Sequence, residues 1–178
     1  SLIPSLEEVG ARFERGDFFV PEMLIAGRAM AGAMEVLRPL LADTGVETVG
    51  KFLMGTVKGD VHDIGKNLVN IMLEGAGFEV IDLGVMVPAQ KILDAAKEHD
   101  ADIIGLSGLI TPSLDEMSNF AVEMERAGLE IPLLIGGATT SRAHTAVKID
   151  QRYEGDVIWV KDASRSVPTA AALLNPAL

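Results

Sequence analysis

Hydrophobic residues recur at helical spacing through residues 1–45, and this part of the sequence reads as helix throughout. We expect two helices there. The first has Ser5 as its N-cap and ends near Gly16, and the second has Pro21 in its first turn and a kink or an end at Pro39. Two helices cannot bury both of their apolar faces alone, so this segment must pack on the rest of the chain.

From about residue 50 the pattern changes to short apolar runs that alternate with helical segments. The expected strands are 51–57, 78–84, 101–108, 131–137 and 156–160, and the expected helices are 64–76, 89–99, 113–127, 142–148 and 164–174. Strict alternation predicts an α/β fold with a five-stranded, parallel, doubly wound sheet of the flavodoxin-like or Rossmann-like kind. We therefore expect a short all-helical segment at 1–45 and an α/β domain at 46–178.

The loops that follow the expected strands carry most of the distinctive polar residues. In chain order they contain GDVHDIG, LGVMVP, SGLITPS, GGATTS and KDAS. The carboxyl ends of parallel strands share one edge of the sheet, and ligands of doubly wound proteins bind at that edge. Glycines there allow a ligand to approach the backbone, and hydroxyl groups and helix-start amides can bind its polar parts.

Composition narrows the classes of function. The chain has 178 residues, of which 48% are hydrophobic, and its net charge of −11 argues against binding to nucleic-acid phosphates. It has no cysteine, which excludes disulfides, iron–sulfur clusters and thiolate metal sites. No apolar run is long enough to span a membrane and the first residues do not resemble a signal peptide, so we expect a cytoplasmic protein.

The loop after the first strand, TVKGDVHDIGKNLV at 56–69, holds two carboxylates and an imidazole, which suit a cation better than a phosphate. Asp60 and His62 are two residues apart in an extended turn, so the carboxylate can support the imidazole as it does beside metal-bound histidines. One protein ligand rarely holds a free ion, so the metal would arrive inside a macrocycle. Two alternatives stay open: Asp60 or Asp63 caps the next helix, and His62 is an ordinary loop histidine.

Other notable side chains are expected to be structural. We expect His99 to lie at the surface near a helix end, and His144 to be exposed at a helix start. Methionines at 23, 30 and 34 form a stripe that favours core packing over a cofactor lid.

Three motifs, each after an expected strand, resemble a known family. They are Asp60-x-His62-x-x-Gly65, Ser107-x-Leu109 and Gly136-Gly137. In this order they are similar to the cobalamin-binding module of cobalamin-dependent methionine synthase and, more broadly, to the corrinoid proteins of methyltransferase systems. The longer strings KGDVHDIGKN, DLGVMVP, GLSGLITPSLDEM, IPLLIGGATTS and DASRSVPTAAALL resemble methionine synthase in particular.

The resemblance implies a role for each matching residue. His62 would be the lower axial ligand of the cobalt, having displaced the cofactor's dimethylbenzimidazole. Asp60 would bond to His62, and Ser113 would extend this relay toward solvent. The channel for the displaced nucleotide tail would be lined by Gly65, Ser107, Leu109, Gly136 and Gly137. The corrin would contact Thr111 and Ala163. The loop residues Gly59, Val61 and Asp63 would complete the cofactor site.

The helical segment resembles the family's cap, which covers the upper face of the corrin. Phe13 and Val20 match positions where bulky apolar residues shield the methyl group, although Val20 is smaller than the leucine usual there. The family's cap is a four-helix bundle, so the resemblance implies that this chain starts near its middle.

The function implied by the resemblance is that of a methyl carrier. Cobalamin, as methylcobalamin with cobalt held by the corrin, would pass a methyl group from methyltetrahydrofolate to homocysteine to make methionine. Other methionine synthase domains or subunits would supply the homocysteine, folate and reactivation sites, and we expect no turnover by this chain alone. The alternatives are a corrinoid shuttle for methylamine, methanol or O-demethylase systems, a cobalamin-dependent sensor, or a structural flavodoxin-like domain.

Overall fold

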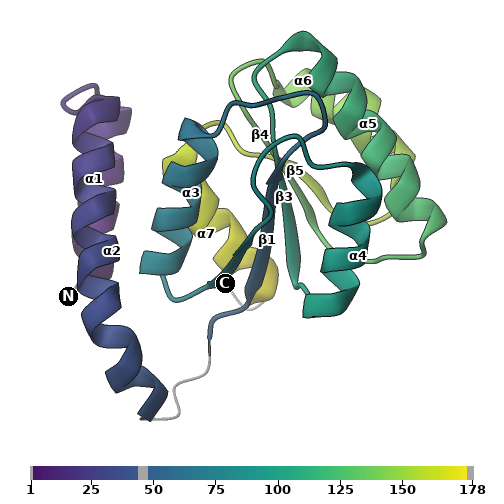
Figure 1. Ribbon diagram of the computed structural model, residues 1–178. Coiled ribbons are helices and arrows are strands. Elements are labelled where there is room, and N and C mark those ends of the chain that lie inside the picture. Colours follow the sequence, from purple (N-terminus) through teal and green to yellow (C-terminus); the bar gives the residue numbers. More distant parts are fainter. Residues whose placement is uncertain (1, 44–47, 176–178) are drawn as a thin grey trace.

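The computed structural model describes residues 2–43 and 48–175 of the chain (Figure 1). The expected boundary between residues 45 and 46 lies outside these residues. The strands are β1 (Lys51–Thr56), β2 (Glu79–Asp82), β3 (Ile103–Ser107), β4 (Leu133–Gly136) and β5 (Val157–Trp159). The helices are α1 (Leu2–Glu14), α2 (Val20–Asp43), α3 (Ile64–Gly75), α4 (Ala89–His99), α5 (Thr111–Arg126), α6 (Arg142–His144) and α7 (Ala163–Leu174).

The five strands form one parallel sheet in the order β2-β1-β3-β4-β5, which is the flavodoxin-like order and confirms the expected fold class. The order reverses between β1 and β3, where the two strands pair side by side with Thr56 opposite Ser107. The loops after β1 and β3 therefore start next to each other, at the place where such sheets bind ligands.

Both faces of the sheet are covered by helices, as the unbroken apolar strands predict. Neighbouring residues of β1 point to opposite faces: Phe52 packs with residues of α3 and α7, and Leu53 packs with residues of α4 and α5. The strands β1 to β4 contribute residues to the core on both faces of the sheet, whereas β5 contributes Val157 to one face. On the other face α3 and α7 lie together, on the side that faces α1 and α2 (Figure 1).

The two N-terminal helices pack side by side against α3, and α1 also meets α7 (Figure 1). A small cluster joins them to the sheet domain, with Met23 and Met30 on α2 and Leu68 and Met72 on α3. The helices approach closely at glycines, because a side chain at Gly75 would collide with Met30. Met23 and Met30 are thus packing residues, as expected; the side chain of Met34 lies outside the described part.

Most of the expected elements are present, and the expected helix 89–99 coincides with α4. Ser5 was expected to cap the first helix but lies inside α1, because that helix already starts at Leu2. At Pro39 we expected a kink or an end, and of these the end is excluded because α2 continues to Asp43. The expected helix 142–148 is the short α6 followed by a π-helical stretch, Thr145–Ile149.

None of the helices in the described ranges is long and apolar enough to cross a bilayer.

Candidate functional site

A tight turn after β1 directs one carboxylate into the protein. The N–H of Asp60 donates to the carbonyl of Val57 at 3.2 Å, and Gly59 between them has a φ of 82°. A side chain at Gly59 would meet open space, so the glycine serves the left-handed backbone conformation and not a close contact. The turn buries Asp60, which is 1% exposed.

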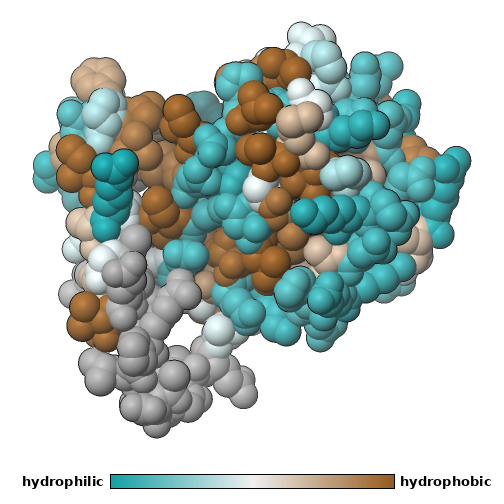
Figure 2. Space-filling model, viewed as in Figure 1, coloured by the Kyte–Doolittle hydropathy of each residue, from teal (hydrophilic) through white to brown (hydrophobic). Residues whose placement is uncertain are grey.

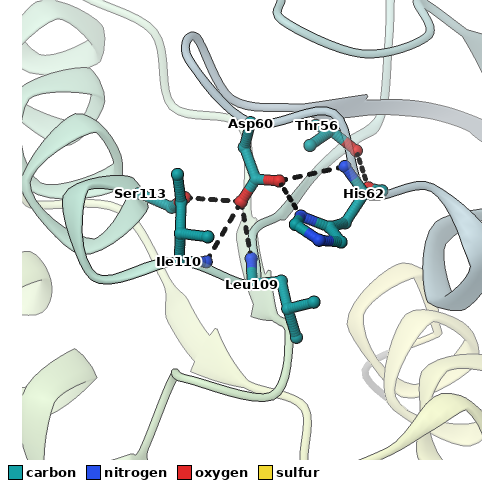
Figure 3. Close-up of polar contacts among 6 residues, drawn as sticks. All are labelled: Thr56, Asp60, His62, Leu109, Ile110 and Ser113. Atoms are coloured by element: carbon teal, nitrogen blue, oxygen red, sulfur yellow. Dashed lines mark hydrogen bonds and ion pairs between the residues drawn. The ribbon is translucent and has the colours of Figure 1, made fainter.

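The carboxylate of Asp60 joins the loops after β1 and β3 (Figure 3). Its Oδ1 accepts from the backbone N–H of His62 at 3.0 Å and from the ring Nδ1 of His62 at 2.7 Å. Its Oδ2 accepts from the N–H groups of Leu109 at 2.6 Å and Ile110 at 3.3 Å, and from the hydroxyl of Ser113 at 2.6 Å. The sequence-predicted trio of Asp60, His62 and Ser113 is therefore assembled in the structure.

These contacts decide the charge of Asp60. Burial alone would raise the pKa of the carboxyl group. Hydrogen bonds from Ser113, from the backbone of His62 and Leu109 and from the His62 ring outweigh that effect, and the pKa lies well below its ordinary value. Asp60 is consequently a carboxylate at neutral pH, and it orients the imidazole with a proton on Nδ1.

His62 presents the other side of its ring to the surroundings. Its side chain is 49% exposed while that of Asp60 is 0% exposed. Thr56 fixes the His62 backbone by donating its hydroxyl to the His62 carbonyl at 2.9 Å. No described residue forms a hydrogen bond with Nε2, so this nitrogen keeps its lone pair for an incoming group.

Apolar side chains surround this imidazole at the same edge of the sheet. The exposed members come from the loops after β1, β2 and β3 and from the start of α3, and they are Val61, Ile64, Val85, Met86 and Leu109. Figure 2 shows apolar atoms gathered in a band between α3 and α4. The backbone of Met86 has a φ of 55°, and its N–H donates to the Asp60 carbonyl at 3.0 Å, which fixes the β2 loop beside the His62 loop.

A cavity of about 370 Å³ lies next to the His62 loop, between the sheet and the helices α2, α3 and α7. Eight of the residues singled out in the sequence line it: Phe13, Val20, Met23, Gly65, Ser107, Gly136, Gly137 and Ala163. The rest of the wall is mostly apolar, with side chains such as Phe52, Leu68 and Leu134. The cavity is thus suited to an uncharged, flat or irregular group.

The two adjacent glycines of the cavity wall have different roles. A side chain at Gly137, whose φ is 121°, would overlap the backbone of Gly108. At Gly136 a Cβ would meet only the carbonyl oxygen of Leu106, at an ordinary 3.8 Å. Gly137 is therefore required by the fold, whereas Gly136 leaves room in the cavity. Thr140 secures their loop by donating its hydroxyl to the Gly137 carbonyl at 2.7 Å.

Some residues lie elsewhere than expected. Leu109 does not line the cavity and instead contacts Asp60 through its N–H. Ser113 is only 1% exposed, so the polar contacts end at a buried hydroxyl and not at solvent. Asp63 is at the N-cap position of α3, but its side chain makes no capping bond. Thr111 begins α5 at the exposed edge.

The remaining histidines are placed as follows. His99 is exposed at the end of α4, as expected. His144 was expected to be exposed but is half-buried, and its Nδ1 is buried with no hydrogen-bond partner in the described part of the chain.

Sequence reasoning missed several contributors. Thr56 and Ile110 hold the loop and the carboxylate, and a side chain at Gly108 would collide with Ser113. Gly108 stands inside the Ser-x-Leu motif, so its place in the sequence was a usable signal. Lys66, on α3, gave no such signal, because its ion-pair partner Asp82 lies at the end of β2.

Comparison with known proteins identifies the family. The B12 binding domain matches residues 50–163, and a second B12 binding domain family matches residues 1–38. The chain therefore belongs to the B12-binding family, and its cofactor is cobalamin.

Solved structures of cobalamin-binding and corrinoid proteins are similar to this chain over nearly its whole length. A cobalamin-binding protein from Desulfitobacterium hafniense is 34% identical with a TM-score of 0.79, over 94% of this chain and 77% of that chain. The monomethylamine corrinoid protein of Methanosarcina barkeri is 29% identical with a TM-score of 0.61, over 97% and 80%. The methanol:cobalamin methyltransferase complex of the same organism is 24% identical with a TM-score of 0.78, over 97% and 64%, and supports the fold.

The geometry of the site fits this cofactor. A single imidazole nitrogen with a free lone pair, set among exposed apolar side chains, suits a metal whose other ligands arrive with it in an apolar ring. The neighbouring cavity offers space for a further part of the same molecule. The loop cluster and the cavity would thus hold two parts of one cofactor.

Proposed function

We propose that the protein is a methyl-carrying corrinoid protein in which His62 would hold the cobalt of cobalamin through Nε2. The observation that carries this proposal is the buried carboxylate of Asp60, which holds the His62 Nδ1 at 2.7 Å and leaves Nε2 without a partner among the described residues. When bound, cobalamin supplies the cobalt that accepts a methyl group and gives it to a second substrate.

The residues of the chain would make this ligand reversible. Asp60 keeps a proton on Nδ1, which makes Nε2 a good ligand. A further proton on Nε2 would remove its lone pair and release His62, while the hydrogen bonds from Leu109, Ile110 and Ser113 keep Asp60 in place. His62 would therefore bind and release the metal, whereas Asp60 would stay in one position.

The cavity would receive the nucleotide tail of cobalamin when His62, and not the benzimidazole of that tail, is the cobalt ligand. Its apolar wall suits the benzimidazole, and Gly65, Ser107 and Gly136 leave room along its side. Phe13 and Val20 belong to the same cavity, so the N-terminal helices would contact the cofactor as well as the sheet domain.

Isotope labelling tests the ligand directly. Protein labelled with ¹⁵N-histidine is mixed with Co(II) cobalamin, and the EPR splitting by the axial nitrogen is recorded. A doublet is expected if the protein's histidine is the ligand, and a triplet if the cofactor's own ¹⁴N base remains bound. His62→Ala should abolish the doublet and the control His99→Ala should keep it; a triplet from the wild-type protein would refute the proposal.

The first candidate reaction transfers a methyl group from methyltetrahydrofolate to homocysteine, and the strings KGDVHDIGKN and IPLLIGGATTS support it by their resemblance to methionine synthase. The second candidate is a shuttle for methylamine- or methanol-type methyltransferases, and the likeness to the monomethylamine corrinoid protein favours it.

The two candidates can be separated with one loaded sample. Methylated protein is offered homocysteine together with the N-terminal half of a methionine synthase, and in parallel a methylamine or methanol methyltransferase. Methionine in the first mixture supports the first candidate, and methyl exchange only in the second mixture supports the shuttle. In both cases we expect no turnover by the chain alone.

A further inference from the structure

Lys66 is a buried cation in the first turn of α3, four residues after His62. It is 2% exposed, and its Nζ donates to Asp82 Oδ2 at 2.5 Å and to Asn67 Oδ1 at 2.7 Å. Lysines are rarely buried to this extent, and the pair contributes little net stability because the ammonium loses its water whereas the Asp82 side chain, which is 37% exposed, keeps part of its own. The position of the pair therefore calls for a reason other than stability.

Asp82 connects Lys66 to the loop after β2. Its second oxygen accepts from the N–H of Gly84 at 2.8 Å, and the Gly84 carbonyl accepts from Thr56 N–H at 3.0 Å. Two residues further on, Met86 N–H donates to the Asp60 carbonyl at 3.0 Å. Through this loop the Lys66 ammonium is linked to Asp60, on the amino-terminal side of the His62 turn.

Asn67 connects Lys66 to the other side of the same turn. Its amide nitrogen donates to Asp63 Oδ2 at 3.2 Å, and Asp63 directly follows His62. These contacts run from Asp60 through the β2 loop, Asp82, Lys66 and Asn67 to Asp63. The backbone from Asp60 to Asp63 closes them into a ring of which His62 is a member. In the Lys66 ring, as we call these contacts, the ammonium joins α3 to Asp82, the last residue of β2.

We infer that Lys66 is a positioning residue that holds the His62 loop in its cobalt-binding position through this ring, so that it sets the share of bound molecules in which His62 is the ligand. The inference rests on the proposed role of His62. Without the ammonium, Asp60 and Thr56 still hold His62, but the β2 loop is no longer tied to α3 and the turn can move relative to the helix. Lys66 also lines the cavity, so the same side chain belongs both to the cavity wall and to the Lys66 ring.

Three variants test the ring. Lys66→Met removes the ammonium and keeps an unbranched apolar side chain. Asn67→Ala removes the side-chain links from Asn67 to Lys66 and Asp63, and it leaves the Lys66–Asp82 ion pair and the backbone bond from Asn67 N–H to the Asp63 carbonyl intact. Lys51→Met is the matched control, because Lys51 donates to the His99 carbonyl at the opposite, amino end of β1.

The spectroscopic measurement is the EPR doublet of ¹⁵N-histidine protein with Co(II) cobalamin at one fixed pH. In Lys66→Met the ratio of histidine-off to histidine-on molecules should rise about threefold to tenfold, as loss of a hydrogen bond would give. A smaller rise in the same direction is expected for Asn67→Ala, and none for Lys51→Met. A purely structural role would lower the melting temperature of Lys66→Met and leave this ratio unchanged, which would overturn the inference.

A second measurement uses the cofactor-free protein. Amide hydrogen exchange is followed at His62 and Met86, whose N–H groups both donate to Asp60. We expect exchange about threefold faster in Lys66→Met and in Asn67→Ala and unchanged in Lys51→Met. If the wild type shows no EPR doublet, His62 is not the cobalt ligand, but the exchange rates still test whether Lys66 holds the His62 loop. Equal exchange rates in the wild type and all variants would contradict that role of Lys66. If Lys66→Met does not fold, Asn67→Ala gives the answer in both measurements.

Discussion

The His62 loop and the cavity beside it share one edge of the sheet but are held together by different forces. In the loop, five hydrogen bonds converge on one buried carboxylate and position a single imidazole. In the cavity, apolar side chains and glycines enclose about 370 Å³. Hydrogen bonds fix direction and suit the placement of one atom, whereas packing fixes shape and suits a larger group. Substitutions in the two regions should therefore fail in different ways.

The largest effect is expected in the cavity wall, at Gly137→Ala. The new Cβ would overlap the Gly108 backbone, and the φ of 121° is strained for alanine, so we expect a loss of about 4 kcal/mol in the free energy of unfolding. Urea denaturation measures it. Gly136→Ala is the matched control: it should cost less than about 1 kcal/mol and still weaken cobalamin binding, because the methyl group projects into the cavity. Equal stability losses at the two glycines would contradict the comparison.

The next largest effect is expected in the loop, at Asp60→Ala. It leaves Leu109 N–H and the Ser113 hydroxyl without their acceptor, and a loss of about 2–3 kcal/mol is expected at neutral pH. Because folding lowers the pKa of Asp60, its charge stabilises the protein above the ordinary carboxyl pKa of about 4, and that contribution is lost as the pH falls through the folded-state pKa.

Denaturation curves of wild type and Asp60→Ala at several pH values measure this effect. The gap in stability should narrow below about pH 4. Asp63→Ala, which removes a more exposed carboxylate of the same loop, should leave stability nearly unchanged. A gap that stayed constant down to strongly acid pH would show that the charge of Asp60 plays no part.

Smaller losses of stability are expected when a threonine is replaced by valine in the His62 loop or in the cavity wall. Thr56→Val removes the bond to the His62 carbonyl, and Thr140→Val removes the bonds to the Gly137 carbonyl and the Trp159 indole. Each should cost about 1 kcal/mol. Hydrogen exchange should quicken in the His62 loop for the first variant and in the 137–140 loop for the second. Identical exchange patterns would mean that the regions are not independent.

The smallest effect is expected outside both regions, at Tyr153→Phe. Burial and the nearby carboxylates of Glu125, Glu130 and Asp156 raise the pKa of Tyr153 to about 12. The stability that this phenol provides is present below its ordinary pKa of about 10 and lost as the pH rises toward 12. Wild type should therefore lose stability faster than Tyr153→Phe over this range, with cobalamin binding unchanged in the variant.

The chain has one tyrosine, so absorbance of the tyrosinate follows this titration without interference. A midpoint near the ordinary value in the folded protein would contradict the buried placement of the ring.

The assembly of the loop cluster could be predicted because it depends on topology. Parallel strands bring their carboxyl ends together, and the pairing of Thr56 with Ser107 places Asp60 within reach of Leu109 and Ser113. The difference between Gly136 and Gly137 could not be predicted, since both letters are the same and only the backbone angle separates them.

Other features depended on contacts that a sequence pattern does not record. Lys66 on α3 pairs with Asp82 at the end of β2, and neither helical nor strand periodicity predicts a contact at their sequence separation of 16 residues. Pro39 stays within α2 although the local preference is to break a helix, which shows tertiary structure overriding propensity.

The methionine cluster between α2 and α3 has a consequence for chemical stability. Met23, Met30 and Met72 are almost completely buried, so an oxidant can reach their sulfur atoms only when the N-terminal helices separate from α3. Each sulfoxide would place a polar oxygen in an apolar contact and keep the helices apart. The rate at which peroxide oxidises these three methionines would therefore measure how often the helices lift from α3, and methionine sulfoxide reductase would reverse the damage while the sheet stays folded.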